Sequence, residues 1–226
     1  MTCCPGSVAR MDRIDLSAAS VFLDFDGTIT CDDTGVYLLQ RLAPPDRWHD
    51  LERRYIAGEI GSKACMIEEW ALLPRDRARV ERVVAEVALD DGFLPLVAAL
   101  RGEGAEVSIL SDGFGFRADQ VGTDAGVPVI TNAIDWASWE VRFPNEVTDC
   151  ECAECGACKR APIRAARSRG RTTVIVGDGA SDVKAAVVAD LVFAKGDLAD
   201  WCARNAIAFE PWDTLADVQR TLTSPS

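Results

Sequence analysis

The chain has 226 residues, of which 48% are hydrophobic and 27% charged, enough for one domain or for one domain with a small insertion. No run approaches the roughly 18 apolar residues that a membrane helix needs, so no membrane contact is expected. Acidic residues outnumber basic ones by 36 to 24, and the net charge of −12 repels nucleic acid and anionic lipid. A small anionic substrate is still compatible with this charge if a metal ion or local cations neutralise one cleft.

Two further features of composition bound the chemistry. The N-terminal stretch lacks the apolar core of a secretory signal, so we expect a cytoplasmic protein in a reducing compartment. His49 is the only histidine, which excludes a His-rich metal site and leaves it far from any serine or cysteine motif that needs a base.

The beginning of the chain predicts a strand followed by a helical insertion. Residues 20–23 form a short apolar run that ends at Asp24, as a buried strand does. The stretch 33–91 shows four apolar helical faces, each closed by proline, glycine or an aspartate-rich turn, and no strand pattern. We therefore expect a helical cap, residues 33–91, inserted into a core formed by residues 1–32 and 92–226.

After the cap, strand and helix patterns alternate. The expected strands are residues 106–110, 127–130, 173–176, 191–194 and a short one near 206–209. The expected helices are residues 93–101, 117–125, 161–168, 181–189 and a last one from Trp201, and residues 134–143 read as a hairpin. The alternation predicts an α/β fold, with a parallel sheet and helices on both of its faces.

Three of the expected strands end in polar turns that contain glycine. These turns are Asp24-Phe25-Asp26-Gly27-Thr28, Ser111-Asp112-Gly113 and Gly177-Asp178-Gly179-Ala180-Ser181-Asp182. Ligands of parallel sheets bind beyond the carboxyl ends of the strands, so the four carboxylates Asp24, Asp26, Asp178 and Asp182 should share one crevice. That density needs a cation, and oxygen ligands favour Mg²⁺. Each turn alone is ordinary loop sequence, but three such turns after three apolar strands indicate a site.

In this order the motifs resemble those of the haloacid dehalogenase-like phosphatases. Residues 24–28 are similar to the first motif of that family, Ser111 to the second, Lys159 to the third, and residues 177–182 to the fourth. The cap after the first motif resembles the phosphoserine phosphatase-like group. The sequences Phe143-Pro144-Asn145 and Cys155-Gly156-Ala157-Cys158-Lys159 are similar to the methionine-salvage branch, whose members hydrolyse 2-hydroxy-3-keto-5-methylthiopentenyl-1-phosphate.

The resemblance implies a Rossmann-like core and a role for each matching residue. Asp24 would be the nucleophile that forms an aspartyl-phosphate, and Asp26 the general acid and base. Residues implied to bind the phosphate are Thr28, Ser111, Asp112, Gly113 and Lys159. Residues implied to hold Mg²⁺ are Asp24, Asp26, Asp178 and Asp182. The substrate would be a small phosphorylated metabolite.

Asp33 is a candidate specificity residue. In the phosphoserine phosphatases a glutamate at this offset binds the substrate amino group, and the shorter aspartate argues here against phosphoserine. The alternative is a helix N-cap for the helix that follows.

Four cysteines, Cys150, Cys152, Cys155 and Cys158, crowd into nine residues just before Lys159. They suggest a structural Zn²⁺ site that would fix the loop carrying this lysine. Disulfides and free thiols are the alternatives.

Other functions remain open. A phosphoserine phosphatase-like enzyme or a phosphotransferase would use the same scaffold, and a non-catalytic phosphate-binding or regulatory protein would retain only the fold. The sequence does not indicate the oligomeric state.

Overall fold

The computed structural model describes residues 14–147 and 154–224 and has the expected α/β architecture. Within these residues, six parallel strands form one sheet in the order β3-β2-β1-β6-β7-β8, and β4 and β5 form a separate antiparallel pair. The sheet strands are β1 (Ala19–Asp24), β2 (Glu106–Leu110), β3 (Val129–Ile130), β6 (Thr172–Gly177), β7 (Leu191–Ala194) and β8 (Glu210–Pro211). Every residue of the central strand β1 is buried, which is why it reads as a continuous apolar run.

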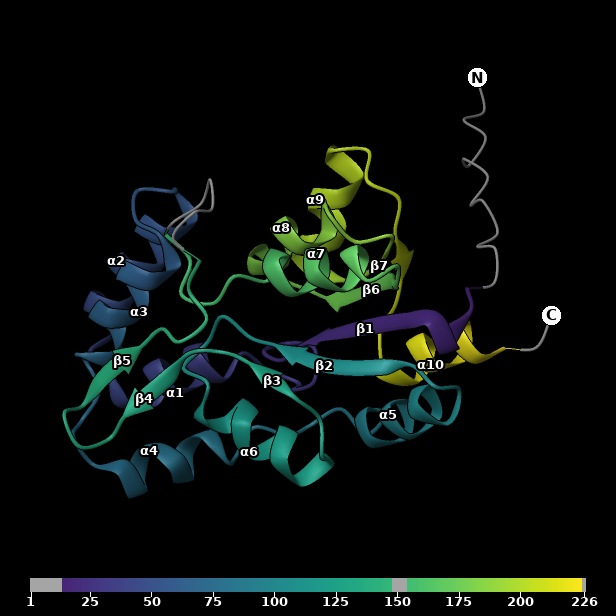
Figure 1. Ribbon diagram of the computed structural model, residues 1–226. Coiled ribbons are helices and arrows are strands. Elements are labelled where there is room, and N and C mark those ends of the chain that lie inside the picture. The colour runs from purple at the N-terminus through teal and green to yellow at the C-terminus, as the bar shows by residue number, and fades with distance from the viewer. Residues whose placement is uncertain (1–13, 148–153, 225–226) are drawn as a thin grey trace.

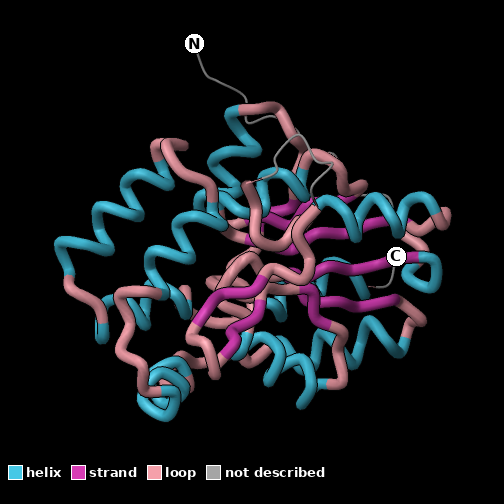
Figure 2. Tube along the Cα trace, turned by 60° about the vertical axis from the view of Figure 1, so that its left-hand side comes forward, coloured by secondary structure: helices cyan, strands magenta, loops and turns pink. Residues whose placement is uncertain are grey.

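Helices cover both faces of the sheet, as Figures 1 and 2 show. One face carries α5 (Phe93–Gly102), α6 (Phe116–Ala125) and α10 (Leu215–Thr223). The other carries α7 (Arg160–Ser168), α8 (Val183–Ala186) and α9 (Gly196–Arg204). The predicted three-layer arrangement is confirmed.

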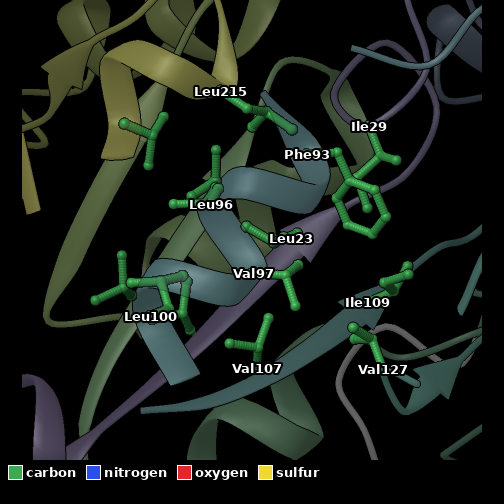
Figure 3. Close-up of a cluster of buried hydrophobic side chains, with 14 of the residues drawn as sticks. Leu23, Ile29, Phe93, Leu96, Val97, Leu100, Val107, Ile109, Val127 and Leu215 are labelled. Carbon is green, nitrogen blue, oxygen red and sulfur yellow. The ribbon is translucent and has the colours of Figure 1, made fainter. Parts of the chain in front are cut away.

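Alternate residues of β1 feed two hydrophobic cores. Val21 and Leu23 join the cluster under α5, where Leu96 and Leu100 are fully buried (Figure 3). Phe22 points the other way and joins the cluster under α7, α8 and α9. The two cores hold β1 rigidly from both sides, so the residue at its end is placed by the most buried part of the molecule.

Four helices lie between β1 and α5, in the stretch expected to form the cap, and the name cap is kept for them. They are α1 (Thr34–Leu42), α2 (Pro45–Ile56), α3 (Ser62–Trp70) and α4 (Arg77–Val84). The chain enters and leaves the cap at one point, because Thr30 forms an isolated antiparallel bridge with Leu89 and the Cys31 N–H donates to the Ala88 carbonyl at 2.9 Å. Buried side chains of these helices, including Leu38 and Trp70, form a third hydrophobic cluster together with Phe114, which follows β2.

The hairpin of β4 (Ala133–Asp135) and β5 (Glu140–Arg142) forms as predicted, and it packs against the cap (Figure 1). The Trp70 ring of α3 lies 5.6 Å from the Trp136 ring and 5.0 Å from the Trp139 ring, centroid to centroid. The cap therefore rests on the hairpin as well as on its own helices.

Several boundaries differ from the prediction. The third strand is Val129–Ile130 and not 127–130, and the final helix α10 was not expected. The last strand is Glu210–Pro211 and not 206–209, because Ala206 has a left-handed backbone (φ 55°) that delays the strand. The preceding helix α9 begins earlier than Trp201, at Gly196. The helix expected over 181–189 is a 3₁₀ turn, Ala180–Asp182, followed by the short α8. Within residues 14–147 and 154–224, no helix has both the length and the apolar character required to cross a bilayer.

Candidate active site

The carboxyl ends of β1, β2 and β6 meet at one edge of the sheet. Asp24, the last residue of β1, pairs in register with Leu110 of β2, and Leu23 pairs with Val176 of β6. The motifs that follow these strands therefore start side by side. Asp24 is 4% exposed, so its carboxylate is almost completely buried at this edge of the sheet.

Lys159 is the centre of the buried charge at this edge. Its Nζ donates to Asp24 Oδ1 at 2.6 Å, to Asp182 Oδ1 at 2.7 Å and to Ser181 Oγ at 2.8 Å. Although burial opposes its charged form, the two carboxylates raise the pKa of Lys159 above its usual range. Burial and the charge of Asp182 in turn raise the pKa of Asp24, against the effect of Lys159. The lysine is a fixed cation beside the nucleophile candidate.

Asp178 completes the cluster from the turn after β6. Thr28 Oγ1 donates to its Oδ1 at 2.7 Å, and a Cβ on Gly27 would lie only 2.3 Å from its Oδ2. Gly27 also has a φ of +75°, so glycine is required there for both backbone and space. Burial, together with the charge of Asp182, raises the pKa of Asp178 to about 6. Thr28 is fully buried, and its hydroxyl is used on Asp178.

The carboxylates of Asp24, Asp178 and Asp182 can hold one metal ion. One oxygen from each lies within 4.8 Å of the others. Asp182 is the most occupied of the three, because its Oδ2 also accepts the N–H groups of Asp178 and Gly179 at 3.2 Å. Among the described residues, Oδ2 of Asp24 and Oδ2 of Asp178 accept no side-chain hydrogen bond. Oxygen ligands and raised carboxyl pKa values fit a hard divalent cation such as Mg²⁺.

Asp26 faces the same crevice from the loop after β1. Its Oδ1 accepts the N–H of Thr34 at 3.0 Å, and its Oδ2 accepts from Ser111 Oγ at 3.5 Å. Burial and the charge of Asp33 raise the pKa of Asp26 to about 6. A carboxyl group in this state can give up and recover a proton near neutral pH. Ser111 Oγ is itself held by the Gly113 N–H at 3.1 Å.

Asp112 joins the cap to the core. Its carboxylate accepts from Ser62 Oγ of α3 at 2.7 Å, from the Ala157 N–H at 2.7 Å and from Asn132 Nδ2 at 3.2 Å. A carboxylate held by three donors, and itself negative, is suited to cross-linking these segments and poorly suited to binding a phosphate. Ala157 lies two residues before Lys159, so the cross-link also anchors the approach to that lysine.

A cavity of about 210 Å³ lies above this edge, between core and cap. Its lining from the core is Asp24, Asp26, Asp112, Gly113, Phe114, Asp178, Gly179, Ala180 and Ser181, and from the cap Asp33, Gly35, Val36, Leu39, Tyr55, Ser62, Cys65, Met66 and Glu69. Asp33 caps α1 through the Val36 N–H at 2.8 Å and also lines this cavity, so its two predicted roles are compatible. The predicted phosphate ligands Thr28, Ser111 and Lys159 are buried outside the lining.

Comparison with known proteins agrees with this geometry. The family model described as haloacid dehalogenase-like hydrolase matches residues 21–186. The chain belongs to the haloacid dehalogenase-like hydrolases. The resemblance found in the sequence motifs is thereby confirmed at the level of the family.

Named relatives and a solved structure are similar to this hydrolase along most of its length. A 2-hydroxy-3-keto-5-methylthiopentenyl-1-phosphate phosphatase of Exiguobacterium sibiricum is 26% identical over 205 residues, covering 88% of this chain and 93% of that protein. One of the same name from Brevibacillus brevis is 29% identical over 209 residues, covering 89% and 94%. A solved phosphoserine phosphatase, in a phospho-aspartyl intermediate analogue form, has a TM-score of 0.70 at 18% identity and covers 91% of this hydrolase and 99% of that chain. This last likeness shows the fold.

The cysteine cluster of this hydrolase is only partly described. Cys150 and Cys152 lie outside the described residues. Cys158 is buried and its N–H donates to the Asn145 carbonyl at 3.2 Å, while the Sγ of Cys155 lies 3.0 Å from Lys184 Nζ. The described residues give the predicted zinc site no support.

Several residues of the site were not singled out from the sequence. Ser181 bonds to Lys159, and its position inside the fourth motif was the available signal. Ser62 and Asn132 hold Asp112, and Glu69 lines the cavity from α3. No local pattern marks these three, because their roles depend on how cap and core face each other.

Proposed function

We propose that this hydrolase releases phosphate from small phosphate monoesters in a Mg²⁺-dependent reaction that passes through an aspartyl-phosphate on Asp24. The observation that carries the proposal is the buried contact of Lys159 with Asp24 and Asp182 beneath the cavity between core and cap. A cation fixed beside a carboxylate lowers the repulsion between that carboxylate and an incoming phosphate. The phosphatase names of the relatives support the same reaction.

Each step of the proposed reaction has a residue on the cavity wall. The Asp24 carboxylate attacks phosphorus while Asp26 gives its proton to the leaving alkoxide oxygen, which releases the alcohol. Asp26 then takes a proton from water, the water oxygen attacks the aspartyl-phosphate, and phosphate leaves with Asp24 regenerated. The pKa of about 6 allows Asp26 to perform both transfers.

In this proposal Mg²⁺ would be held by the carboxylates of Asp24 and Asp178, and the backbone carbonyl of Asp26 would be a further ligand. When bound, it supplies positive charge that screens the phosphate oxygens. Asp182 has a supporting role, because it is already occupied by Lys159 and two backbone N–H groups. Thr28 orients Asp178, and Ser111 orients Asp26.

The residues that line the cavity also limit which phosphate esters can bind. Val36, Leu39 and Met66 of the cap and Phe114 of the core offer apolar surface, which suits an apolar tail such as the methylthio group of the relatives' substrate. No lysine or arginine is found among the described residues that line the cavity, so the carboxylate of phosphoserine would lack a partner. We infer a cytoplasmic enzyme acting on a small phosphorylated metabolite without a second negative group.

The test is phosphate release from a panel of esters, each with Mg²⁺ and with EDTA. The panel includes 2-hydroxy-3-keto-5-methylthiopentenyl-1-phosphate, phosphoserine and sugar phosphates. We expect Mg²⁺-dependent release that Asp24→Asn abolishes and that Asp200→Asn, an exposed carboxylate on α9, leaves unchanged. No release from any ester would overturn the proposal, and release by Asp24→Asn at the native rate would overturn the assignment of the nucleophile.

A further inference from the structure

Glu69 brings an acidic group into the cavity from the cap. It lies in the last turn of α3, is half-buried, and accepts from the Cys65 thiol at 3.4 Å. Its neighbour Glu68 differs, since that side chain is exposed and pairs with Arg54 on the surface. One of two consecutive glutamates therefore faces the substrate space, and the other faces solvent.

The groups around Glu69 are acidic or neutral. Asp33 shares the cavity wall at the start of α1, Glu52 acts on it from α2, and Cys65 contacts it from its own helix. Burial raises the pKa of Glu69 to about 7, and the charges of Glu52 and Asp33 add to the effect. Lys159, the buried cation of the site, is already bound to Asp24 and Asp182 on the floor. The cap end of the cavity thus has carboxylates and no lining cation among the described residues.

We propose that Glu69 is a specificity-determining residue that favours phosphate monoesters whose tail ends in a positive charge and disfavours tails that end in a carboxylate. The inference rests on the proposed phosphatase function and deepens it by naming the charge of the preferred tail. A carboxylate shielded from water attracts a protonated amine more strongly than an exposed one does, and it repels an anion by the same physics. Neutral tails take an intermediate place.

The probes are three short phosphate monoesters. Phosphoethanolamine, 2-hydroxyethyl phosphate and phosphoglycolate share a phosphate on a two-carbon tail and differ mainly in the charge at its end. Their relative kcat/KM values measure charge selectivity with size nearly constant.

The decisive variant is Glu69→Gln, with Glu68→Gln as its matched control. Both remove one negative charge from the same helix, but only the first removes it from the cavity. We expect Glu69→Gln to lower kcat/KM for phosphoethanolamine relative to 2-hydroxyethyl phosphate about tenfold, and to raise the relative value for phosphoglycolate. The change should appear mainly in KM, because the tail is bound alike in the ground and transition states. Glu68→Gln should leave the three ratios unchanged.

The pH dependence gives a second readout. The ratio of kcat/KM for phosphoethanolamine to that for 2-hydroxyethyl phosphate cancels groups that act on both esters alike, Asp26 among them. In the wild type this ratio should rise as the pH increases through about 7, because Glu69 becomes ionised while the substrate amine stays protonated. In Glu69→Gln the ratio should be flat.

The outcomes distinguish failure of the proposed phosphatase function from failure of the role assigned to Glu69. No phosphate release from these three esters or from the wider panel would overturn the proposed function and this inference together. Release from panel esters but from none of the three, or ratios that Glu69→Gln does not move, would overturn the inference alone.

Discussion

The hydroxyl of Thr28 is hydrogen-bonded to the carboxylate of Asp178. It is fully buried and donates to Asp178 Oδ1 at 2.7 Å, which leaves the other oxygen of Asp178 facing Gly27 and the cluster. Groups that hold a metal ligand in place are worth roughly 10–100-fold in metal affinity. We therefore expect Thr28 to act on a metal ion bound at Asp178 more than on the phosphate.

Replacing Thr28 with valine tests this role. Thr28→Val keeps the shape and removes the donor, so the Mg²⁺ concentration for half-maximal activity should rise about tenfold. Thr173→Val is the matched control, because Thr173 is equally buried and donates to Asp190 at 2.8 Å, at the far end of β6. A raised KM for the ester with unchanged Mg²⁺ dependence would instead mean that Thr28 binds the phosphate directly.

A comparison of Gly27 with Gly58 separates the effect of backbone strain from that of a side-chain clash. Both have a left-handed backbone, with φ of +75° and +71°, but only Gly27 has Asp178 in the space of a Cβ. Gly58→Ala should cost only the backbone strain, about 1–2 kcal/mol in the free energy of unfolding. Gly27→Ala should cost more and should also lower activity, which denaturant unfolding and steady-state assays measure. Equal loss of activity in both variants would contradict the contact argument.

Among the elements, the junction between α3 and the core is held by Asp112. Ser62 reaches it from the N-terminus of α3, and Ala157 reaches it from the segment that leads to Lys159. The nearby Gly156 has no room for a side chain, because a Cβ there would lie 2.7 Å from Asn132 and 2.9 Å from Asp112. Cap and lysine loop are thus bound to the same carboxylate.

Ser62→Ala should loosen this junction without removing any group that reacts. Loss of the hydrogen bond should cost about 1 kcal/mol and raise KM about fivefold, with a smaller effect on kcat. Ser168→Ala, which removes an exposed hydroxyl bonded only within α7, is the control. An unchanged KM in Ser62→Ala would show that the bond does not contribute to substrate binding.

The elements also show how far sequence patterns reach. The strands before Asp24 and Asp178 were predictable because nearly complete burial leaves continuous apolar runs. The strand before Ser111 is only partly buried, and its apolar end, Ile109 and Leu110, carried the prediction. The predicted hairpin is also present, with Trp136 and Trp139 in the turn between its strands. The short strand near the C-terminus was misplaced, since the left-handed Ala206 leaves no sequence signature.

In the candidate site, too, some features were predictable from the sequence and others were not. The clustering of Asp24, Asp178 and Asp182 followed from the topology of a parallel sheet. Asp112 was assigned to the phosphate, whereas its partners lie in the cap and in the lysine loop. Contacts between segments far apart in the chain depend on packing, which periodicity does not encode.

At the scale of the whole molecule, we expect repulsion among the buried carboxylates to lower the free energy of unfolding and a bound metal ion to raise it. Mg²⁺ at about 100 times its Kd should stabilise the native state by about 2.7 kcal/mol and raise Tm by roughly 5–10 °C. Asp178→Asn removes one charge from the cluster, so in EDTA its Tm should equal or exceed that of the wild type, while the Mg²⁺-induced shift disappears. Asp200→Asn, on the surface of α9, should keep the full shift. A normal shift in Asp178→Asn, measured by calorimetry, would remove Asp178 from the metal site.

The bridge between Thr30 and Leu89 gives the cap a modular character. Because the two connecting segments meet, the core experiences the whole insertion as one surface loop with pinned ends. A change in the length or sequence of such a loop adds little closure entropy. The cap can therefore diverge, or be exchanged for another insertion, while β1 and its terminal aspartate keep their place. Substrate preference can evolve in one part of the chain while the reacting groups are conserved in the other.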